Sequence, residues 1–181
     1  MAAAIPSDTE ALPPAEFGEK YEWLEVVQDH VRIAVVGDRG CGKSCLILSA
    51  KNQTLPDPEE NFFSKRYPLD LEGTKGMVVD VDEFREVYQD SDVILLCFAL
   101  NDPSSFESIS NKWVLREHLP KKRCILVGLK QDLRKIGDLS GQAENLREKL
   151  DFHKYMECSA YTKKGVLPVF REAFKCATLE K

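Results

Sequence analysis

The sequence has 181 residues, 43% of them hydrophobic, which is enough for one domain with a sizeable core. Its longest strongly apolar stretch, residues 93–100, has the length of a strand, and the first residues lack the layout of a secretory signal. The net charge is −5, but residues 31–181 hold 24 basic and 23 acidic side chains. The short apolar stretch argues against a membrane-spanning protein. The near-neutral charge of residues 31–181 argues against a nucleic acid-binding one.

The six cysteines do not form a pattern typical of a disulfide framework or a zinc site, because none is in C-x-x-C spacing. Cys97 and Cys124 lie inside apolar runs, which favours buried free thiols. We therefore expect a reducing compartment and a cytoplasmic protein.

Residues 1–30 differ from the rest of the chain, because they hold seven carboxylates and one lysine. Residues 1–20 are small, acidic and proline-containing, which is typical of a disordered extension. Residues 21–30 are more apolar, and both a helical turn and an edge strand remain open for them.

From Val31 to the end, predicted strands alternate with predicted helices. The β-branched run 31–36 predicts a buried strand, and 43–52 has helical spacing. Residues 66–81 predict two strands around a turn at 72–74, with Pro68 at a sheet edge because proline cannot donate to a ladder. The next predicted elements are a strand at 92–100, a helix at 103–119, a strand at 123–129, a helix at 141–150, a strand at 154–158 and a helix at 165–179.

This alternation predicts an α/β fold, with a mostly parallel six-stranded sheet, one antiparallel edge strand, and helices on both faces. Residues 31–181 are expected to form this domain, and residues 1–30 an acidic extension. Ligands of such sheets bind at the carboxyl ends of the strands.

The first strand leads into a phosphate-loop motif, G-x-x-x-x-G-K-[ST]. Its backbone N–H groups would converge on phosphate oxygens, Lys43 would face the outer phosphates, and the Ser44 hydroxyl would bind magnesium. A chance glycine-rich turn is the alternative. The candidate phosphate-binding residues are Gly37, Asp38, Arg39, Gly40, Cys41, Gly42, Lys43, Ser44 and Cys45.

Two later segments resemble the guanine motifs of the small GTPases of the Ras superfamily. "VGLKQDL" (127–133) resembles [NT]-K-x-D, in which the aspartate receives two guanine N–H groups and the lysine stem packs along the base. Lys130 and Asp132 match, whereas Leu129 replaces the residue that braces the phosphate loop. "ECSAYTKKGV" (157–166) resembles the S-A-K motif, with Ser159 and Ala160 matching and Tyr161 replacing the lysine.

Within the superfamily the text is most similar to the Rho family, for example "DSDVILLCFALNDPSSFESISNKW" and "YMECSAYTKKGV". The resemblance covers about residues 31–178, although the extra helical insert of Rho proteins is missing between 133 and 156. It implies a P-loop small-GTPase-like domain in signal transduction, with GTP or GDP and Mg²⁺ as cofactors, and Asp80 in the magnesium shell.

Both switch regions depart from the family. Residues 55–67 contain no threonine that would bind magnesium, although Ser64 would substitute with a register shift. In the D-x-x-G-Q segment, Glu83 replaces the glycine and Phe84 replaces the glutamine that orients water. No catalytic residue is therefore assigned.

Arg39 is a third departure, since this position is usually glycine in the family. An arginine here would act as a cation for the transition state, or it would be a structural residue that is either solvated on the rim of the site or paired with Asp38 or Glu59. Both interpretations remain open.

Three functions follow from these residues. The first is a guanine-nucleotide switch with slow or lost hydrolysis, and the second is a non-enzymatic pseudo-GTPase that acts as an interaction module. The third, an ATP-binding P-loop protein, is disfavoured by Asp132. The resemblance implies effectors or regulators as partners. We expect a monomer. We also expect no C-terminal lipid anchor, because Cys176 is sixth from the end and no polybasic run precedes it.

Overall fold

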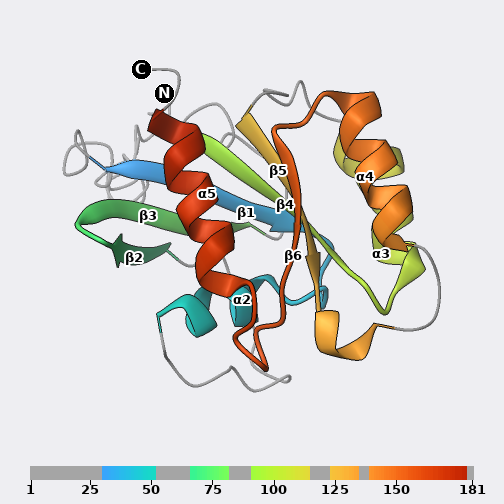
Figure 1. Ribbon diagram of the computed structural model, residues 1–181, viewed down its shortest axis with the longest axis horizontal. Helices are drawn as coiled ribbons and strands as arrows, with labels where there is room; N and C mark the ends of the chain where they lie inside the picture. The colour runs from blue at the N-terminus through green and yellow to red at the C-terminus, as the bar shows by residue number, and fades with distance from the viewer. Residues whose placement is uncertain (1–29, 52–65, 82–90, 115–122, 135–138, 179–181) are drawn as a thin grey trace, which may run out of the picture.

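The structure is a computed structural model that describes residues 30–51, 66–81, 91–114, 123–134 and 139–178. Six strands form one sheet in the order β2-β3-β1-β4-β5-β6 (Figure 1). The strands are β1 (Val31–Gly37), β2 (Arg66–Leu71), β3 (Thr74–Val81), β4 (Val93–Ala99), β5 (Cys124–Leu129) and β6 (Lys154–Glu157). The helices are α2 (Lys43–Ala50), α3 (Pro103–Ser108), the π-helix η1 (Ile109–Val114), the 3₁₀-helix η3 (Gln131–Leu133), α4 (Leu139–Leu150) and α5 (Val166–Thr178).

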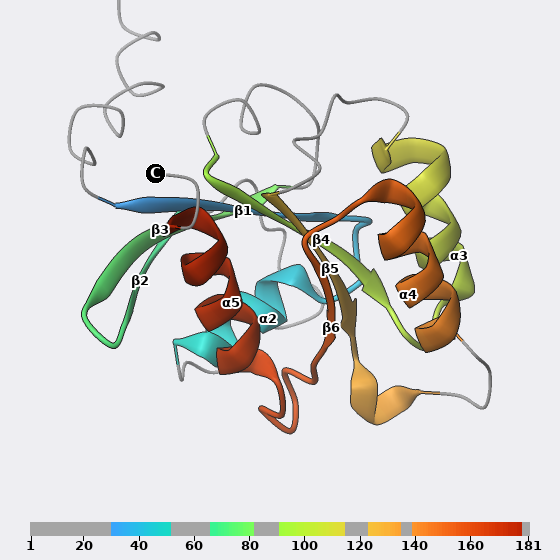
Figure 2. The ribbon, with the colours of Figure 1, turned by 45° about the horizontal axis from the view of Figure 1, so that its top comes forward.

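The pairing of the strands confirms the predicted sheet. β1 lies between β3 and β4 and is parallel to both, while β2 and β3 form the antiparallel pair at one end (Figure 2). Pro68 lies in β2, the edge strand, opposite Met77. An edge is the position where a missing backbone donor costs least, so the tertiary structure explains why this proline is tolerated.

Helices cover both faces of the sheet, as expected. Because side chains alternate along β1, Ile33 and Val35 face α2 and α5, whereas Ala34 and Val36 face α3, η1 and α4. Every residue of β4 and of β5 is buried, which is why both strands are continuously apolar in the sequence.

Some element boundaries differ from the expectations. Of the helix predicted at 103–119, the described part runs to 114: it is α-helical from Pro103 to Ser108 and continues as the π-helix η1. Its predicted start is confirmed, because Asp102 caps the helix by accepting a hydrogen bond from the Ser104 N–H at 3.1 Å. α4 begins at Leu139, two residues before the predicted start.

Two further predictions concern the N-terminal extension and Cys176. The acidic extension, residues 1–29, lies outside the described residues. Cys176 in α5 is 3% exposed, so its thiol is part of the core. Among the described residues, no helix is both long enough and apolar enough to span a membrane.

Candidate functional site

The phosphate-loop motif forms the connection between β1 and α2, at the carboxyl end of the central strand. Gly37 has φ +150°, and a Cβ atom there would lie 2.2 Å from the Cys97 carbonyl oxygen of β4. Gly42, at φ +115°, occupies the cap position of α2. The loop therefore passes so close to the neighbouring strand, and turns so sharply into the helix, that only glycine fits at both positions.

Lys43 lies across the loop and is only 4% exposed. Its ammonium donates hydrogen bonds to the Gly37 carbonyl at 3.0 Å and to the Asp38 carbonyl at 3.2 Å. These contacts place a buried positive charge at the start of α2, where the helix dipole also favours an anion.

Ser44 and Asp80 meet at the same end of the sheet. The Ser44 hydroxyl donates to the Asp80 carboxylate with an oxygen–oxygen distance of 2.5 Å, and Asp80 is 4% exposed at the end of β3. A hydroxyl and a carboxylate are oxygen donors of the type that Mg²⁺ prefers. The pair predicted as the metal site, Ser44 and Asp80, thus fits that ion by donor type and by proximity.

Lys130 connects the first guanine-like segment to the phosphate loop. Its ammonium donates to the Gly40 carbonyl at 2.8 Å, and its backbone adopts a positive φ of 58°. A Cβ atom on Gly42 would lie 3.6 Å from both Leu129 Cδ1 and Lys130 Cε. Leu129 therefore lies beside the loop at the cavity wall, at the position where the sequence resemblance led us to expect a polar side chain.

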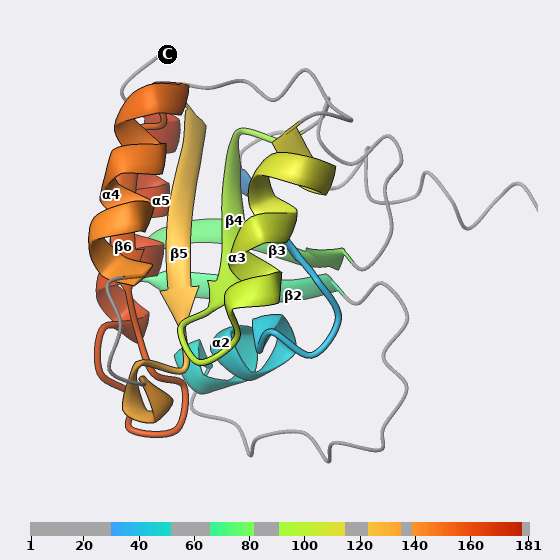
Figure 3. The same cartoon turned by 90° about the vertical axis from the view of Figure 1, so that its right-hand side faces the viewer.

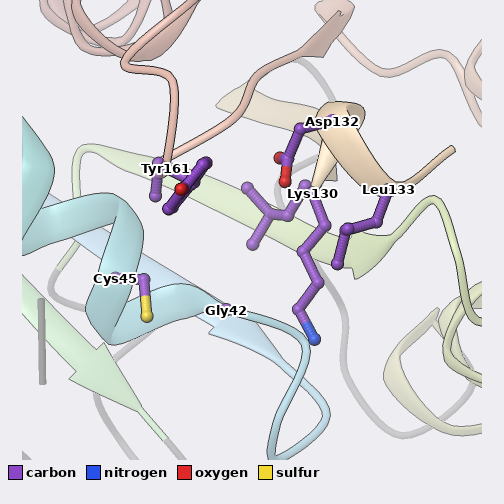
Figure 4. A pocket seen from close by; sticks show the side chains of 8 residues that line it. Gly42, Cys45, Lys130, Asp132, Leu133 and Tyr161 are labelled. Atoms are coloured by element: carbon purple, nitrogen blue, oxygen red, sulfur yellow. The ribbon is translucent and has the colours of Figure 1, made fainter. Parts of the chain in front are cut away.

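A cavity of about 330 Å³ opens between these segments (Figure 4). In the close view the Tyr161 ring lies on the side of α2 and Cys45, the Asp132 carboxylate lies on the opposite side, and the Lys130 side chain extends toward the phosphate loop. Leu133 and Tyr161 are 53% and 79% exposed. The lining residues are Gly42, Cys45, Leu129, Lys130, Asp132, Leu133, Ala160 and Tyr161.

The segment with Ser159 and Ala160 is held in place by its own hydrogen bonds. The Ser159 hydroxyl, in a side chain that is almost fully buried, accepts from the Thr162 N–H at 3.0 Å. The Ala160 carbonyl accepts from the Ser49 hydroxyl of α2 at 3.0 Å. Ser159 therefore shapes the turn, and Ala160 lies at the cavity wall.

Glu157, at the end of β6, holds the segment that carries Asp132. Its carboxylate accepts hydrogen bonds from the Gln131 amide at 3.0 Å and from the Tyr155 hydroxyl at 2.7 Å, and it forms an ion pair with Arg134. These contacts join η3 to β6, so the two guanine-like segments are positioned together.

The remaining loop residues have different environments. Arg39 is exposed, and the Asp38 side chain contacts η1. Burial raises the pKa of the Cys41 thiol to about 11, and it also raises the pKa of Cys45, which lines the cavity. Both cysteines are therefore protonated thiols at neutral pH.

The structure brings together every site residue predicted from the sequence that lies in the described ranges. The residues on which the switch regions were judged, including Glu83 and Phe84, lie outside the described residues. Sequence reasoning did not assign Leu133 and Tyr161 to the cavity wall, nor Trp113 to a contact with the phosphate loop. The only sequence signal for Tyr161 was its place in the S-A-K segment, and Trp113 had no spacing signal.

The chain was compared with known protein families. The model of the Ras family matches residues 32–178, which is nearly the whole described fold. This chain is a Rho-like member of the Ras superfamily of small GTPases. Among its relatives, Ras-like GTP-binding protein RHO1 of Entamoeba histolytica is 37% identical over 163 residues, covering 81% of this chain and 75% of that protein. Human Rho-related GTP-binding protein RhoB is 32% identical over 173 residues, covering 81% of this chain and 88% of that protein.

The phosphate loop, the K-x-D segment and the S-A segment all lie within the residues that the Ras family model matches. The matched family also confirms the fold predicted from the sequence pattern.

Proposed function

We propose that this Rho-like chain binds GDP and GTP together with Mg²⁺ at the site between the phosphate loop and the cavity. The observation that carries the proposal is the 2.8 Å hydrogen bond from Lys130 to the Gly40 carbonyl. This contact joins the two halves of the site, so a ligand that fills the cavity with its base reaches the loop with its phosphates.

The base would bind in the cavity. The Asp132 carboxylate is suited to accept two N–H groups of guanine, a pattern that adenine does not present. The Lys130 stem and Tyr161 supply flat or extended surfaces for the two faces of the ring, and Leu129 and Leu133 add apolar contact. By family resemblance, the Ala160 N–H would meet the guanine carbonyl.

The phosphates would bind along the loop from Gly37 to Ser44. Lys43 supplies charge, and the backbone N–H groups at the start of α2 supply donors. Ser44 would hold Mg²⁺, with Asp80 beside it, and the ion would neutralise phosphate charge. Arg39 lies exposed on the same loop.

We further propose that the protein is an atypical GTPase in which hydrolysis is slow or lost. The support is in the sequence: residues 55–67 hold no threonine, and Phe84 stands where the family has its water-orienting glutamine. The same losses favour the second candidate, a non-enzymatic pseudo-GTPase that acts as a protein-interaction module. Without contacts to the γ-phosphate, GTP and GDP would stabilise the same conformation.

The remaining parts of the proposal concern the cell. We propose a cytoplasmic monomer with an acidic extension at 1–30, a G domain at 31–181, and protein effectors or regulators as partners in signal transduction. All six cysteines are free, which supports a reducing compartment.

The nucleotide content of the purified protein tests binding directly. Denatured protein is expected to release GDP or GTP, and Lys43→Ala is expected to lose it, while Lys75→Ala on an exposed part of β3 retains it. Protein that carries no nucleotide and binds GDP no better than ADP would contradict the proposal.

Asp132→Asn tests the orientation of the base. The amide presents a donor to the guanine amino group, so GDP affinity should fall by at least about tenfold. Xanthosine diphosphate, which carries a carbonyl at that position, should gain affinity. A variant that keeps the wild-type preference for GDP would place the base elsewhere.

Single-turnover hydrolysis tests whether hydrolysis is slow or lost, which both candidate functions require. Phosphate release from bound GTP is expected to be slower than the ordinary intrinsic rate of small GTPases. Release at that ordinary rate would contradict both a slow enzyme and a pseudo-GTPase.

A further inference from the structure

The Asp38 side chain is bonded to η1, the π-helix that continues from α3. The ribbon in Figure 3 shows α3 beside the connection between β1 and α2. One carboxylate oxygen, Oδ1, accepts from the Lys112 ammonium at 3.0 Å and from the Trp113 indole N–H at 3.0 Å. We refer to Asp38, Lys112 and Trp113 as the Asp38 cluster. Both partners belong to η1, a π-helix, and helices of this type are rare and often occur at functional sites.

The cluster is a charge-assisted contact in a partly buried position. Trp113 is 1% exposed, and the side chains of Asp38 and Lys112 are 24% and 41% exposed. Burial alone raises the pKa of Asp38, but hydrogen bonds from Ser108, Lys112 and Trp113 outweigh it and lower the pKa below its usual value. The carboxylate is therefore ionised at neutral pH and keeps its contacts with η1.

Asp38 also contributes its backbone to the site. Its carbonyl accepts from the Lys43 ammonium at 3.2 Å and from the Cys41 N–H at 3.3 Å. The residue thus connects the lysine that would face the phosphates to η1. A displacement of the Asp38 side chain would therefore also move the Asp38 carbonyl that accepts from the Lys43 ammonium.

We propose that Lys112 and Trp113 are positioning residues for phosphate binding, which hold the negative charge of Asp38 against η1 and away from the bound anion. The inference rests on the proposed function, since it concerns how the same loop accepts phosphates. A carboxylate inside an anion-binding loop opposes its ligand by Coulomb repulsion unless a cation and a donor engage it.

Removal of the Lys112 charge tests this role. In Lys112→Gln, GDP affinity should fall by about tenfold, because Asp38 is left without its cation next to the phosphates. The loss should be greater for GDP than for GMP, and should shrink when the salt concentration rises from about 0.05 M to 0.5 M. A merely structural role of Lys112 would produce neither dependence.

The matched variants complete the design. Lys112→Arg retains the charge and should retain affinity. Lys149→Gln removes the same charge at the end of α4 and should leave affinity unchanged. In an Asp38→Asn background, Lys112→Gln should cause no further loss, because the repelling charge is already gone. Thermal unfolding of each variant reports whether it is folded.

The outcomes separate this inference from the proposed function. If the wild-type chain binds GDP and Lys112→Gln binds it equally well, the positioning role is wrong and nucleotide binding stands. An equal loss for GDP and GMP, or a full loss that persists in the Asp38→Asn background, also overturns it. If the wild-type chain binds no guanine nucleotide, both proposals fail together.

Discussion

Single residues decide how this site departs from the family pattern. Leu129 and Tyr161 replace polar or charged family residues, and both line the same cavity. Leu129 lies beside Gly42 of the phosphate loop, since a Cβ atom added to Gly42 would be 3.6 Å from Leu129 Cδ1. The exchange makes the cavity wall more apolar, which favours a flat aromatic ligand such as a purine.

Tyr161 is the residue whose effect on the base is easiest to measure. Its ring is 79% exposed beside the cavity, so stacking on a bound purine would cover it. Tyr161→Ala should weaken GDP binding by roughly tenfold, in line with about 1–3 kcal/mol for base stacking on an aromatic side chain. Titration calorimetry would measure the change.

The control for this prediction is Tyr161→Phe, which keeps the ring and removes only the hydroxyl. It should bind GDP within about threefold of wild type, since stacking depends on the ring. If Tyr161→Ala binds GDP as tightly as the wild-type chain, the ring does not contact the base.

At the scale of elements, the sheet and α5 are held together by close packing at Gly76 in β3. A Cβ atom at Gly76 would lie 2.6 Å from Phe174 Cε1 and 3.0 Å from the Val31 carbonyl oxygen. Phe174 is 6% exposed, so it has little room to move. The glycine is required because strand β3 and helix α5 approach one another closely.

Gly76→Ala should therefore destabilise the fold by about 1–3 kcal/mol, the usual cost of overpacking a core. Chemical denaturation would measure the free energy of unfolding. Phe174→Leu should recover part of the loss in the double variant, and Lys75→Ala on the exposed side of β3 serves as the control. A fully stable Gly76→Ala would mean that α5 shifts without cost.

A second contact between elements, at Glu172 of α5, should depend on pH. Its carboxylate accepts from Lys154 of β6 at 2.9 Å and lies 2.8 Å from a ring nitrogen of His153. Hydrogen bonds from Lys154, the larger cause, and from His153 lower the pKa of Glu172 below its ordinary value of 4.5. Because the folded-state pKa is depressed, the stabilisation is present above about pH 4.5 and is lost as the pH falls through the folded-state value.

The measurement is the free energy of unfolding of the wild-type chain and of Glu172→Gln at several pH values. The wild-type chain should be more stable by about 1 kcal/mol at pH 6–7, and the difference should shrink below pH 4.5. A difference that is constant down to pH 3 would show that the carboxylate charge contributes nothing.

At the scale of the whole molecule, a ligand that binds only the folded chain should stabilise it. GDP with Mg²⁺ at about 100 times its dissociation constant should add about 2.7 kcal/mol, which raises Tm. Chelation of Mg²⁺ should remove part of this gain, since Ser44 and Asp80 would lose the ion that neutralises the phosphates. Scanning calorimetry with and without chelator would measure it.

Two comparisons control this prediction. ADP at the same concentration should raise Tm less than GDP, because it lacks the N–H pattern that Asp132 would accept. Lys43→Ala should show a smaller shift with either nucleotide. An equal shift for ADP and GDP would contradict guanine recognition.

The sequence alone determined the local features of this protein. The β-branched run before Gly37 and the G-x-x-x-x-G-K-S spacing were enough to predict β1, the loop and α2, because strand and loop formation there depend on near neighbours. The alternation of strands and helices predicted a mostly parallel sheet. Pro68 predicted an edge position for its strand.

Only the tertiary structure decided which distant residues meet. The contact of Asp38 with Trp113 spans 75 positions, and the support of the Asp132 segment by Glu157 joins η3 to β6. The π-helical form of η1 was not predicted either, since its sequence is compatible with an ordinary α-helix. Such contacts depend on how the chain packs in three dimensions, and no spacing in the sequence encodes them.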